Sequence, residues 1–275
     1  MRRLLITVLV LAASALLAPA ALATTQTATS GAVTATFAFT GQFPSFSGLR
    51  LTIAQSGSVL YDQPVSSKWC GNSCAPMATA GTASSVHVID LDHTGQPNVV
   101  LDLYTGGAHC CSIEQVFTFD SASSTYTMAE RDFGDPGARI QDLHHDGHFE
   151  FVTADDAFAY AFTDFAASGM PLQILTFSSG RFSDVTGQFP ALIRKDAASW
   201  LKAFRSEARQ HYPDTVGLIA AWAADEYRLG KVAAANRFLH QQARAGHLNS
   251  PLGRSVAQGR KFVTRLQKFL RRHGY

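Results

Sequence analysis

The chain has 275 residues, 46% of them hydrophobic, and a formal net charge of +2. This apolar content is sufficient for one large domain or two smaller ones, and beyond the N-terminal stretch no segment is long and apolar enough to span a bilayer. The small net charge conceals an asymmetry. Residues 24–189 carry 16 acidic and 5 basic side chains, whereas residues 190–275 carry 5 acidic and 16 basic ones.

The N-terminus has the pattern of a secretory signal peptide. Arg2 and Arg3 precede an apolar run over residues 4–17, and the small residues Ala21 and Ala23 flank a cleavage site. We therefore expect residues 1–23 to be removed near Ala23, and the mature protein to be secreted or retained in the periplasm or cell envelope.

Residues 32–190 alternate apolar and polar side chains in short runs, which are broken by Gly, Pro, Asp and Ser clusters. This period of two predicts strands throughout, including one over "EFVTADDAFAYAF". We expect an N-terminal β unit and linker over residues 24–79, followed by two β repeats over residues 80–190.

The repeat is visible as an ungapped match. "VIDLDHTGQPNVV", residues 88–100, aligns with "IQDLHHDGHFEFV", residues 140–152, and two further strands follow each copy. Each copy therefore has the size of a four-stranded propeller blade. Two copies cannot close a ring, so residues 32–66 are either a third, diverged unit or part of an open propeller-like or sandwich-like assembly.

Each copy contains a loop of the calcium-binding type. Acidic side chains at alternate positions can converge on one cation, and the sixth position holds a glycine where the chain turns. The expected ligands are Asp90, Asp92, Thr94, the carbonyl of Gln96 and Asn98 in the first copy, and Asp142, Asp146, the carbonyl of His148 and Glu150 in the second.

This strand-loop-strand setting resembles the FG-GAP and VCBS-type repeats of integrin-like β-propellers. The segment "FGDPGARIQDLHHDGHFEFV" also has a Phe-Gly pair ahead of its loop. The resemblance implies extracellular Ca²⁺ held between strands for rigidity, in a domain used for adhesion or recognition. Two alternatives remain open: metal-free turns held by side chain to backbone hydrogen bonds, and a transition metal bound by His144, His145, His148 and Glu150.

The four cysteines of an exported protein are first interpreted as two disulfides. We favour the local pairs Cys70–Cys74 and Cys110–Cys111, with cross-pairing between the two segments as the alternative. Gly106 and Gly107 allow the backbone to leave strand geometry, which a bond between adjacent cysteines requires.

No catalytic pattern stands out, and we name no catalytic residue. The chain has no G-x-S-x-G, no phosphate-binding glycine loop and no H-E-x-x-H. The alternative to a binding protein is a secreted, glycosidase-like hydrolase that uses Asp155, Asp156 and Asp164.

Residues 191–275 are expected to form a basic helical domain, because apolar residues recur there at spacings of three and four. The last helix could bind an anionic wall polymer or membrane surface; we favour the alternative, that its apolar stripe packs on the other helices. The sequence as a whole predicts an α+β protein, mainly β with a helical C-terminal domain. Its expected function is binding or scaffolding, with an extracellular protein or envelope polymer as partner and no nucleic acid.

Overall fold

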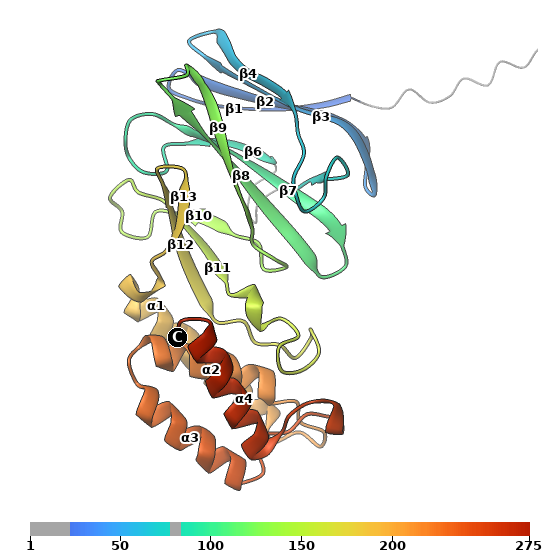
Figure 1. The fold of residues 1–275 in the computed structure, drawn as a ribbon, viewed down its shortest axis with the longest axis vertical. Coiled ribbons are helices and arrows are strands. Elements are labelled where there is room, and N and C mark those ends of the chain that lie inside the picture. The colour runs from blue at the N-terminus through green and yellow to red at the C-terminus, as the bar shows by residue number, and fades with distance from the viewer. Residues whose placement is uncertain (1–22, 78–83) are drawn as a thin grey trace, which may run out of the picture.

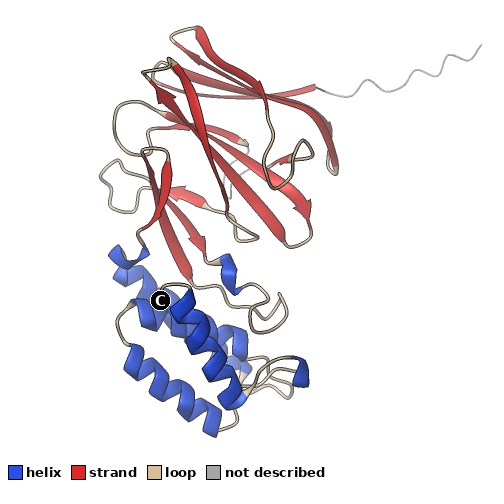
Figure 2. Ribbon diagram, viewed as in Figure 1, coloured by secondary structure: helices blue, strands red, loops and turns tan. Residues whose placement is uncertain are grey.

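The computed structural model describes residues 23–77 and 84–275. The predicted signal peptide, apart from Ala23, lies outside these residues. Three antiparallel sheets follow one another along the long axis of the molecule, and a helical region lies at the far end (Figures 1 and 2). The expected α+β class, mainly β with C-terminal helices, is confirmed.

The first sheet, called here the N-terminal sheet, is a four-stranded meander. Its β2 alternates between fully buried residues, such as Val33 and Phe37, and partly exposed threonines, as expected for a sheet with one face on a core. The strands are β1 (Ala23–Ser30), β2 (Val33–Gln42), β3 (Ser45–Gln55) and β4 (Ser58–Pro64).

The other two sheets are also antiparallel meanders. The central sheet contains β5 (Ala75–Pro76), β6 (Val86–Ile89), β7 (Asn98–Gly107), β8 (Cys110–Asp120) and β9 (Thr125–Asp132), with both β5 and β6 paired to β7. The third sheet contains β10 (Arg139–Gln141), β11 (Glu150–Ala154), β12 (Leu172–Ser178) and β13 (Arg181–Asp184). The strands β6–β9 and β10–β13 are the two four-stranded units that follow from the sequence repeat.

The central sheet is covered on both faces. Leu101 packs toward the N-terminal sheet, in a core with Phe37 and Leu51, whereas Val100 packs toward Phe151 of the third sheet. Adjacent strand residues point to opposite faces, so the apolar run in β7 supplies both cores. The sheets are stacked face to face, and the strands in the described part of the chain do not close a ring.

The strand predicted over residues 150–162 ends earlier than expected, at Ala154. Asp155 caps the short 3₁₀ helix η1 (Asp156–Phe158) by accepting the Ala157 N–H, which diverts the chain from the sheet. Phe158 and Phe162 then enter the helical core, where both contact the ring of Phe269. The prediction was wrong here because local capping and distant aromatic packing override the alternating pattern.

The helical region forms one core around α2, whose Ala220, Ala221, Ala223 and Ala224 are fully buried. No described helix is long and apolar enough to cross a membrane. The elements are η2 (Thr186–Gln188), α1 (Pro190–Glu207), α2 (Val216–Arg228), α3 (Val232–Arg244), η3 (Gly253–Ser255) and α4 (Gly259–Arg272).

Candidate functional site

The first repeated loop connects β6 to β7, and its aspartates hold its own backbone. The Oδ1 atom of Asp90 accepts the N–H of Thr94 at 3.0 Å, and Oδ2 accepts the N–H of Gly95 at 2.7 Å. The Thr94 hydroxyl donates to Asp92 Oδ1 at 3.1 Å. His93 and Gly95 both have positive φ, which is how the chain turns twice within a few residues.

The second loop, between β10 and β11, reproduces this hydrogen-bond frame. Asp142 accepts the N–H of Asp146 at 3.1 Å and that of Gly147 at 3.0 Å, again one bond to each oxygen. His145 and Gly147 have positive φ at the positions of His93 and Gly95. The two loops therefore share the same backbone hydrogen bonds as well as similar sequences.

The two loops also contact each other; together they are called here the twin loops (residues 90–98 and 142–150). Nδ1 of His93 lies 2.8 Å from the carbonyl oxygen of Asp146, and Asp92 forms an isolated bridge with His148. The rings of His93 and His148 are 5.6 Å apart. Since one loop belongs to the central sheet and the other to the third sheet, this contact joins the two sheets.

The ninth position of each loop points inward. The side chain of Asn98 accepts the Leu91 N–H and donates to Thr118, and Glu150 accepts the Leu143 N–H at 3.0 Å. Both residues are 3% exposed. In each loop, a side-chain oxygen of this residue therefore accepts a hydrogen bond from the loop's own backbone.

The remaining predicted ligands lie nearer the surface. Gln96 turns its side-chain oxygen toward Gln55 of β3, and Nδ1 of His148 lies 3.3 Å from Asp146 Oδ1. Burial alone would raise the pKa of Asp142, but the Gly147 and Asp146 amides outweigh it and the net pKa is lowered. The His148 amide is the main reason that the pKa of Asp146 is also lowered. Both carboxylates are therefore held in the charged form.

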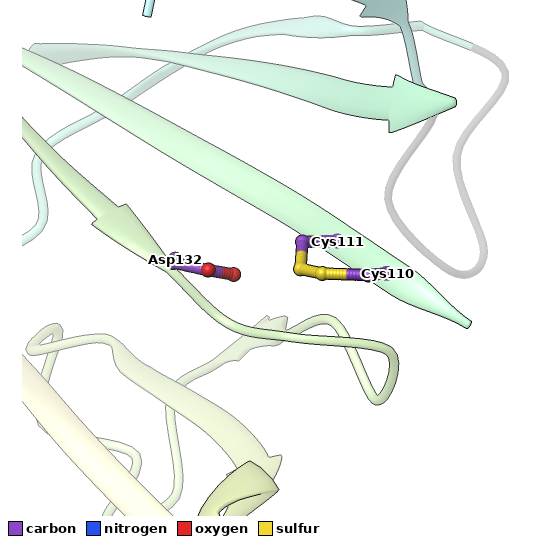
Figure 3. Close-up of side chains that lie close together, drawn as sticks. All are labelled: Cys110, Cys111 and Asp132. Carbon is purple, nitrogen blue, oxygen red and sulfur yellow. A yellow bond between two sulfur atoms is a disulfide. The ribbon is translucent and has the colours of Figure 1, made fainter. Parts of the chain in front are cut away.

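Among the described residues, a different group brings three side chains of metal-ligating type close together. The sulfur atoms of Cys110 and Cys111 and a carboxylate oxygen of Asp132 lie within 4.8 Å of one another (Figure 3). The structure joins the two cysteines in a disulfide, with Asp132 beside it. The two sulfurs are therefore joined to each other at the start of β8.

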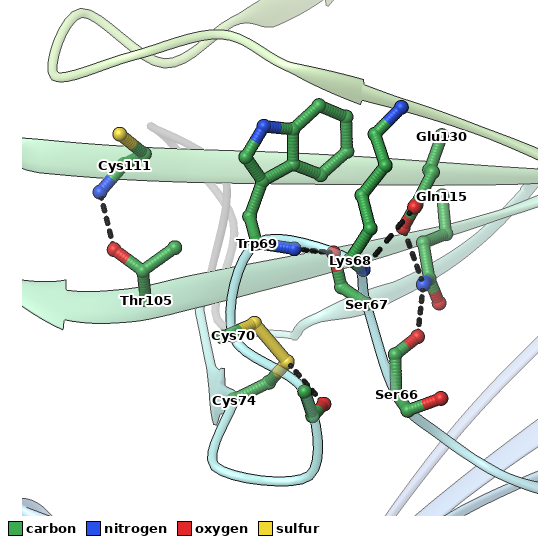
Figure 4. Close-up of a disulfide and its surroundings, with 11 residues drawn as sticks. Ser66, Ser67, Lys68, Trp69, Cys70, Cys74, Thr105, Cys111, Gln115 and Glu130 are labelled. Carbon is green, nitrogen blue, oxygen red and sulfur yellow. Dashed lines mark hydrogen bonds between the residues drawn. A yellow bond between two sulfur atoms is a disulfide. The ribbon is translucent and has the colours of Figure 1, made fainter.

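The predicted Cys70–Cys74 disulfide is confirmed, with a Cα–Cα distance of 5.1 Å. It closes a loop against the central sheet (Figure 4). Gln115 Nε2 donates to the carbonyl of Ser66 at 2.7 Å, and the Lys68 N–H donates to Glu130. The disulfide and these bonds fix the linker between the N-terminal and central sheets.

Two acidic side chains lie side by side in the interior of the central sheet, opposite one another on β7 and β8. Asp102 is 1% exposed and Glu114 is 2% exposed, and His87 Nε2 lies 3.2 Å from Asp102 Oδ2. Burial, and secondarily the charge of Asp102, raises the pKa of Glu114 well above its usual value. The spacing of these residues along the sequence does not reveal the cluster, because strand pairing creates it.

A second buried acidic pair lies where the third sheet meets the helices. Asp196 of α1 accepts the Leu172 N–H at 2.8 Å and the Trp200 Nε1–H at 3.0 Å. Beside it, Asp225 of α2 is fully buried, and no N–H or O–H of the described residues donates to it. Burial, and then the neighbouring Asp196, raises the pKa of Asp225 to about 9. The raised pKa favours the neutral form of Asp225 at pH 7.

Arg228 and Tyr275 complete this contact, which is called here the sheet-helix junction (Asp155, Leu172, Asp184, Asp196, Asp225, Arg228 and Tyr275). Arg228 reaches the carbonyl of Leu172 at 2.5 Å and Asp184 at 3.2 Å, and its guanidinium lies 4.4 Å from the centre of the Tyr275 ring. The Tyr275 hydroxyl donates to Asp155 at 2.7 Å, and burial raises its pKa. Nothing in the sequence pattern singled out Asp196, Asp225 or Tyr275.

The three aspartates proposed for a hydrolase site, Asp155, Asp156 and Asp164, each bind a different partner. Asp155 binds Tyr275 and η1, Asp156 accepts the Asp135 N–H, and Asp164 accepts the Ala167 N–H. A cavity of about 450 Å³ lies near the junction, and Asp196 is the acid in its lining. Asp155, Asp156 and Asp164 are not among its lining residues.

Comparison with known family models finds a match in the helical region. Residues 193–274 match the family model described as the sll0997 C-terminal domain. The chain is 31% identical over 151 residues to the "Probable thylakoid lumen protein sll0997" of Synechocystis, which covers 54% of this chain and 44% of that protein. It is 26% identical over 152 residues to the "Uncharacterized protein y4bJ" of Sinorhizobium fredii, with coverages of 54% and 24%.

The chain thus spans less than half the length of these two curated relatives. No solved structure is significantly similar to it. The sheet-helix junction takes Asp196, Asp225 and Arg228 from the segment that matches the family model, and Leu172 and Asp184 from the third sheet.

Proposed function

We propose that this protein is a binding or scaffold module of an extracytoplasmic compartment, and that calcium at the twin loops stiffens its stacked β units. The observation that carries the proposal is the matched frame of the two loops, with Asp90 and Asp142 each accepting two backbone amides. Loops that keep the same bonds in two copies, and contact each other, form a rigid platform between sheets.

The donors suit a hard cation. Asp90, Asp92 and Thr94 offer oxygen atoms in the first loop, as do Asp142 and Asp146 in the second, and Ca²⁺ prefers oxygen ligands. Bound calcium would supply a positive charge that offsets the repulsion among these carboxylates. The FG-GAP and VCBS-type resemblance supports the same assignment.

The compartment is supported by three independent features. The N-terminal sequence has the pattern of a signal peptide, the four cysteines are paired as is common outside the cytoplasm, and one relative is named as a probable thylakoid lumen protein. We infer a partner that is an extracellular protein or an envelope polymer.

A calcium titration of the mature protein tests the proposal. A ligand that binds only the folded state raises the free energy of unfolding by about 2.7 kcal/mol at a hundredfold excess over Kd. We expect denaturant melts in calcium and in EDTA to differ in this sense, and Asp90→Asn or Asp142→Asn to reduce the difference.

Asp120→Asn is the matched control, because Asp120 also accepts a backbone N–H in an exposed turn but lies outside both loops. This variant should keep the full calcium response. A wild-type protein whose melt is identical in calcium and EDTA would contradict calcium binding. The twin loops would then be metal-free turns held by hydrogen bonds.

A further inference from the structure

The helical region carries a large excess of unpaired positive charge. All 16 of its Lys and Arg residues lie in the described part of the chain, and of these 16 only Arg228 and Lys231 form ion pairs with acids of the described residues. Most of the others, on α1, α3 and α4, are exposed. The acidic half of the same chain does not cover them.

Three of these cations surround one hollow, called here the α4 groove. Arg265, Lys268 and Arg272 line a cavity of about 330 Å³ together with Ala157, Ala161 and Phe269. The four α4 residues occur at spacings of three and four, so they share one face of the helix. The cavity has cationic walls and an apolar floor.

The groove is partly preorganised. Arg265 donates from Nη2 to the carbonyl of Ala161 at 2.6 Å, and its guanidinium lies 5.7 Å from the centre of the Phe162 ring. These contacts hold the guanidinium at the groove while leaving other N–H groups for a ligand. The nearest acids in sequence to Ala157 are directed elsewhere, since Asp155 binds the Tyr275 hydroxyl and Asp156 accepts the Asp135 N–H.

We propose that the α4 groove binds a phosphate-bearing polymer. Two guanidinium groups and an ammonium around one small hollow match a phosphate group, whose several oxygens accept forked hydrogen bonds from arginine. Arg260, Lys261 and Arg271 continue the positive charge along the exposed side of α4, which favours a chain of repeated anionic groups over a single small anion.

The structure disfavours insertion into a membrane by the same helix. Phe262, Val263, Leu266 and Leu270 are all fully buried in the helical core, so α4 has no apolar stripe left to enter a bilayer. This agrees with the packing that we favoured for the last helix. The inference rests on the proposed binding role and names its partner class, but it does not depend on calcium.

Binding of the full mature chain to linear polyphosphate, measured by titration calorimetry at low and high salt, tests the proposal. We expect saturable binding that weakens as salt rises. The variant Arg265→Gln/Lys268→Gln/Arg272→Gln should lose about a hundredfold in affinity, because three charge-assisted contacts are removed. Inorganic phosphate should compete only weakly.

A matched variant separates the groove from general positive charge. Arg194→Gln/Lys202→Gln/Arg205→Gln removes the same three charges from exposed positions on α1, and it should bind nearly as the wild type does. Equal losses in both triple variants, or no loss in the α4 variant, would overturn the groove assignment. Binding to vesicles containing anionic lipid, without binding to polyphosphate, would overturn the polymer in favour of a membrane. Far-UV circular dichroism checks that each variant is folded.

The Asp90→Asn/Asp142→Asn variant distinguishes this inference from the calcium proposal. Its affinity for polyphosphate in EDTA should equal that of the wild type, whatever the outcome of the calcium melts. A loss of polyphosphate binding in this variant would overturn the placement of the site on α4.

Discussion

The third sheet contacts the central sheet through the twin loops and contacts the helices through the sheet-helix junction. Both contacts depend on aspartates, but in opposite states. At the twin loops, Asp142 is near the surface and accepts two amides, which lower its pKa. At the junction, Asp225 is fully buried and next to Asp196, and its pKa is raised to about 9. An aspartate thus stabilises one contact as an anion, and another aspartate lies in the other contact with its neutral form favoured.

This difference gives the two contacts opposite responses to pH. A carboxyl with a raised folded pKa stabilises the fold fully below its unfolded pKa, and that contribution is lost as the pH rises through the folded value. A carboxyl with a lowered pKa contributes above its unfolded pKa, and loses that contribution as the pH falls through the folded value. Acidification should weaken the twin loops first, and alkalinisation the junction.

The largest expected effect is at the junction, from Asp225→Asn. Between about pH 4 and about pH 9 the unfolded acid is ionised while the folded one is neutral, so wild-type stability should fall with rising pH. One proton accounts for at most about 1.4 kcal/mol per pH unit. Asparagine keeps a donor for Asp196 and does not titrate, so the variant should show a flatter profile and higher stability near pH 8. Denaturant melts at several pH values measure this.

An unchanged slope in Asp225→Asn would show that the buried pair does not carry the proton that we assign to it. Asp164→Asn is a suitable control, because Asp164 is an exposed acid in the loop between β11 and β12.

The second effect compares the two loop glycines. A Cβ on Gly147 would overlap the ring of His93, whereas a Cβ on Gly95 has nothing within 4 Å. Gly95→Ala should cost only the strain of positive φ, about 1 to 2 kcal/mol. Gly147→Ala should cost about 3 kcal/mol, because overpacking adds to the strain. The free energy of unfolding of the two variants provides the comparison.

The double variant Gly147→Ala/His93→Ala tests the reason for that difference. Removing the ring should recover part of the loss, with a coupling of about 1 kcal/mol or more. Additive losses would mean that the two loops do not press on each other as described.

A smaller effect is expected from Tyr275→Phe, which removes the hydroxyl that donates to Asp155 and leaves the ring against Arg228. We expect a loss of about 1 kcal/mol, the usual net value of a hydrogen bond. Tyr212→Phe is the control, since Tyr212 is 75% exposed. Equal stability of the Tyr275→Phe protein and the wild type would show that this hydrogen bond does not stabilise the junction.

The smallest effect should come from Asp142→Asn in the absence of calcium. The pKa of Asp142 is below its usual 3.8, so its contribution is present at neutral pH and is lost only as the pH falls below about 4. The variant should therefore differ from the wild type at pH 6 and converge with it in strong acid. Thermal melts across this range measure this; equal stability of the variant and the wild type already at pH 6 would show that the two amide bonds contribute nothing.

The sequence by itself predicted what depends on local pattern. The period of two in residues 32–190 and the spacings of three and four after residue 190 predicted the β and helical regions, because burial of one face imposes these periods. The ungapped match of residues 88–100 to residues 140–152 located both loops, and glycines at their sixth positions marked the turns. The sequence favoured the local pair Cys70–Cys74 over cross-pairing, and the structure confirms that pair.

Only the tertiary structure decided which side chains meet across elements. The pairing of β7 with β8 brings Asp102 beside Glu114, and the packing of α1 on α2 brings Asp196 beside Asp225. The contact of His93 with the second loop depends on stacking the central and third sheets. The strand that ends at Ala154 shows the same limit, since Phe158 and Phe162 gain more from the helical core than from continuing an alternating pattern. Local periodicity records which face of an element is buried but not what lies against it, and the charge state of an aspartate depends on that neighbour.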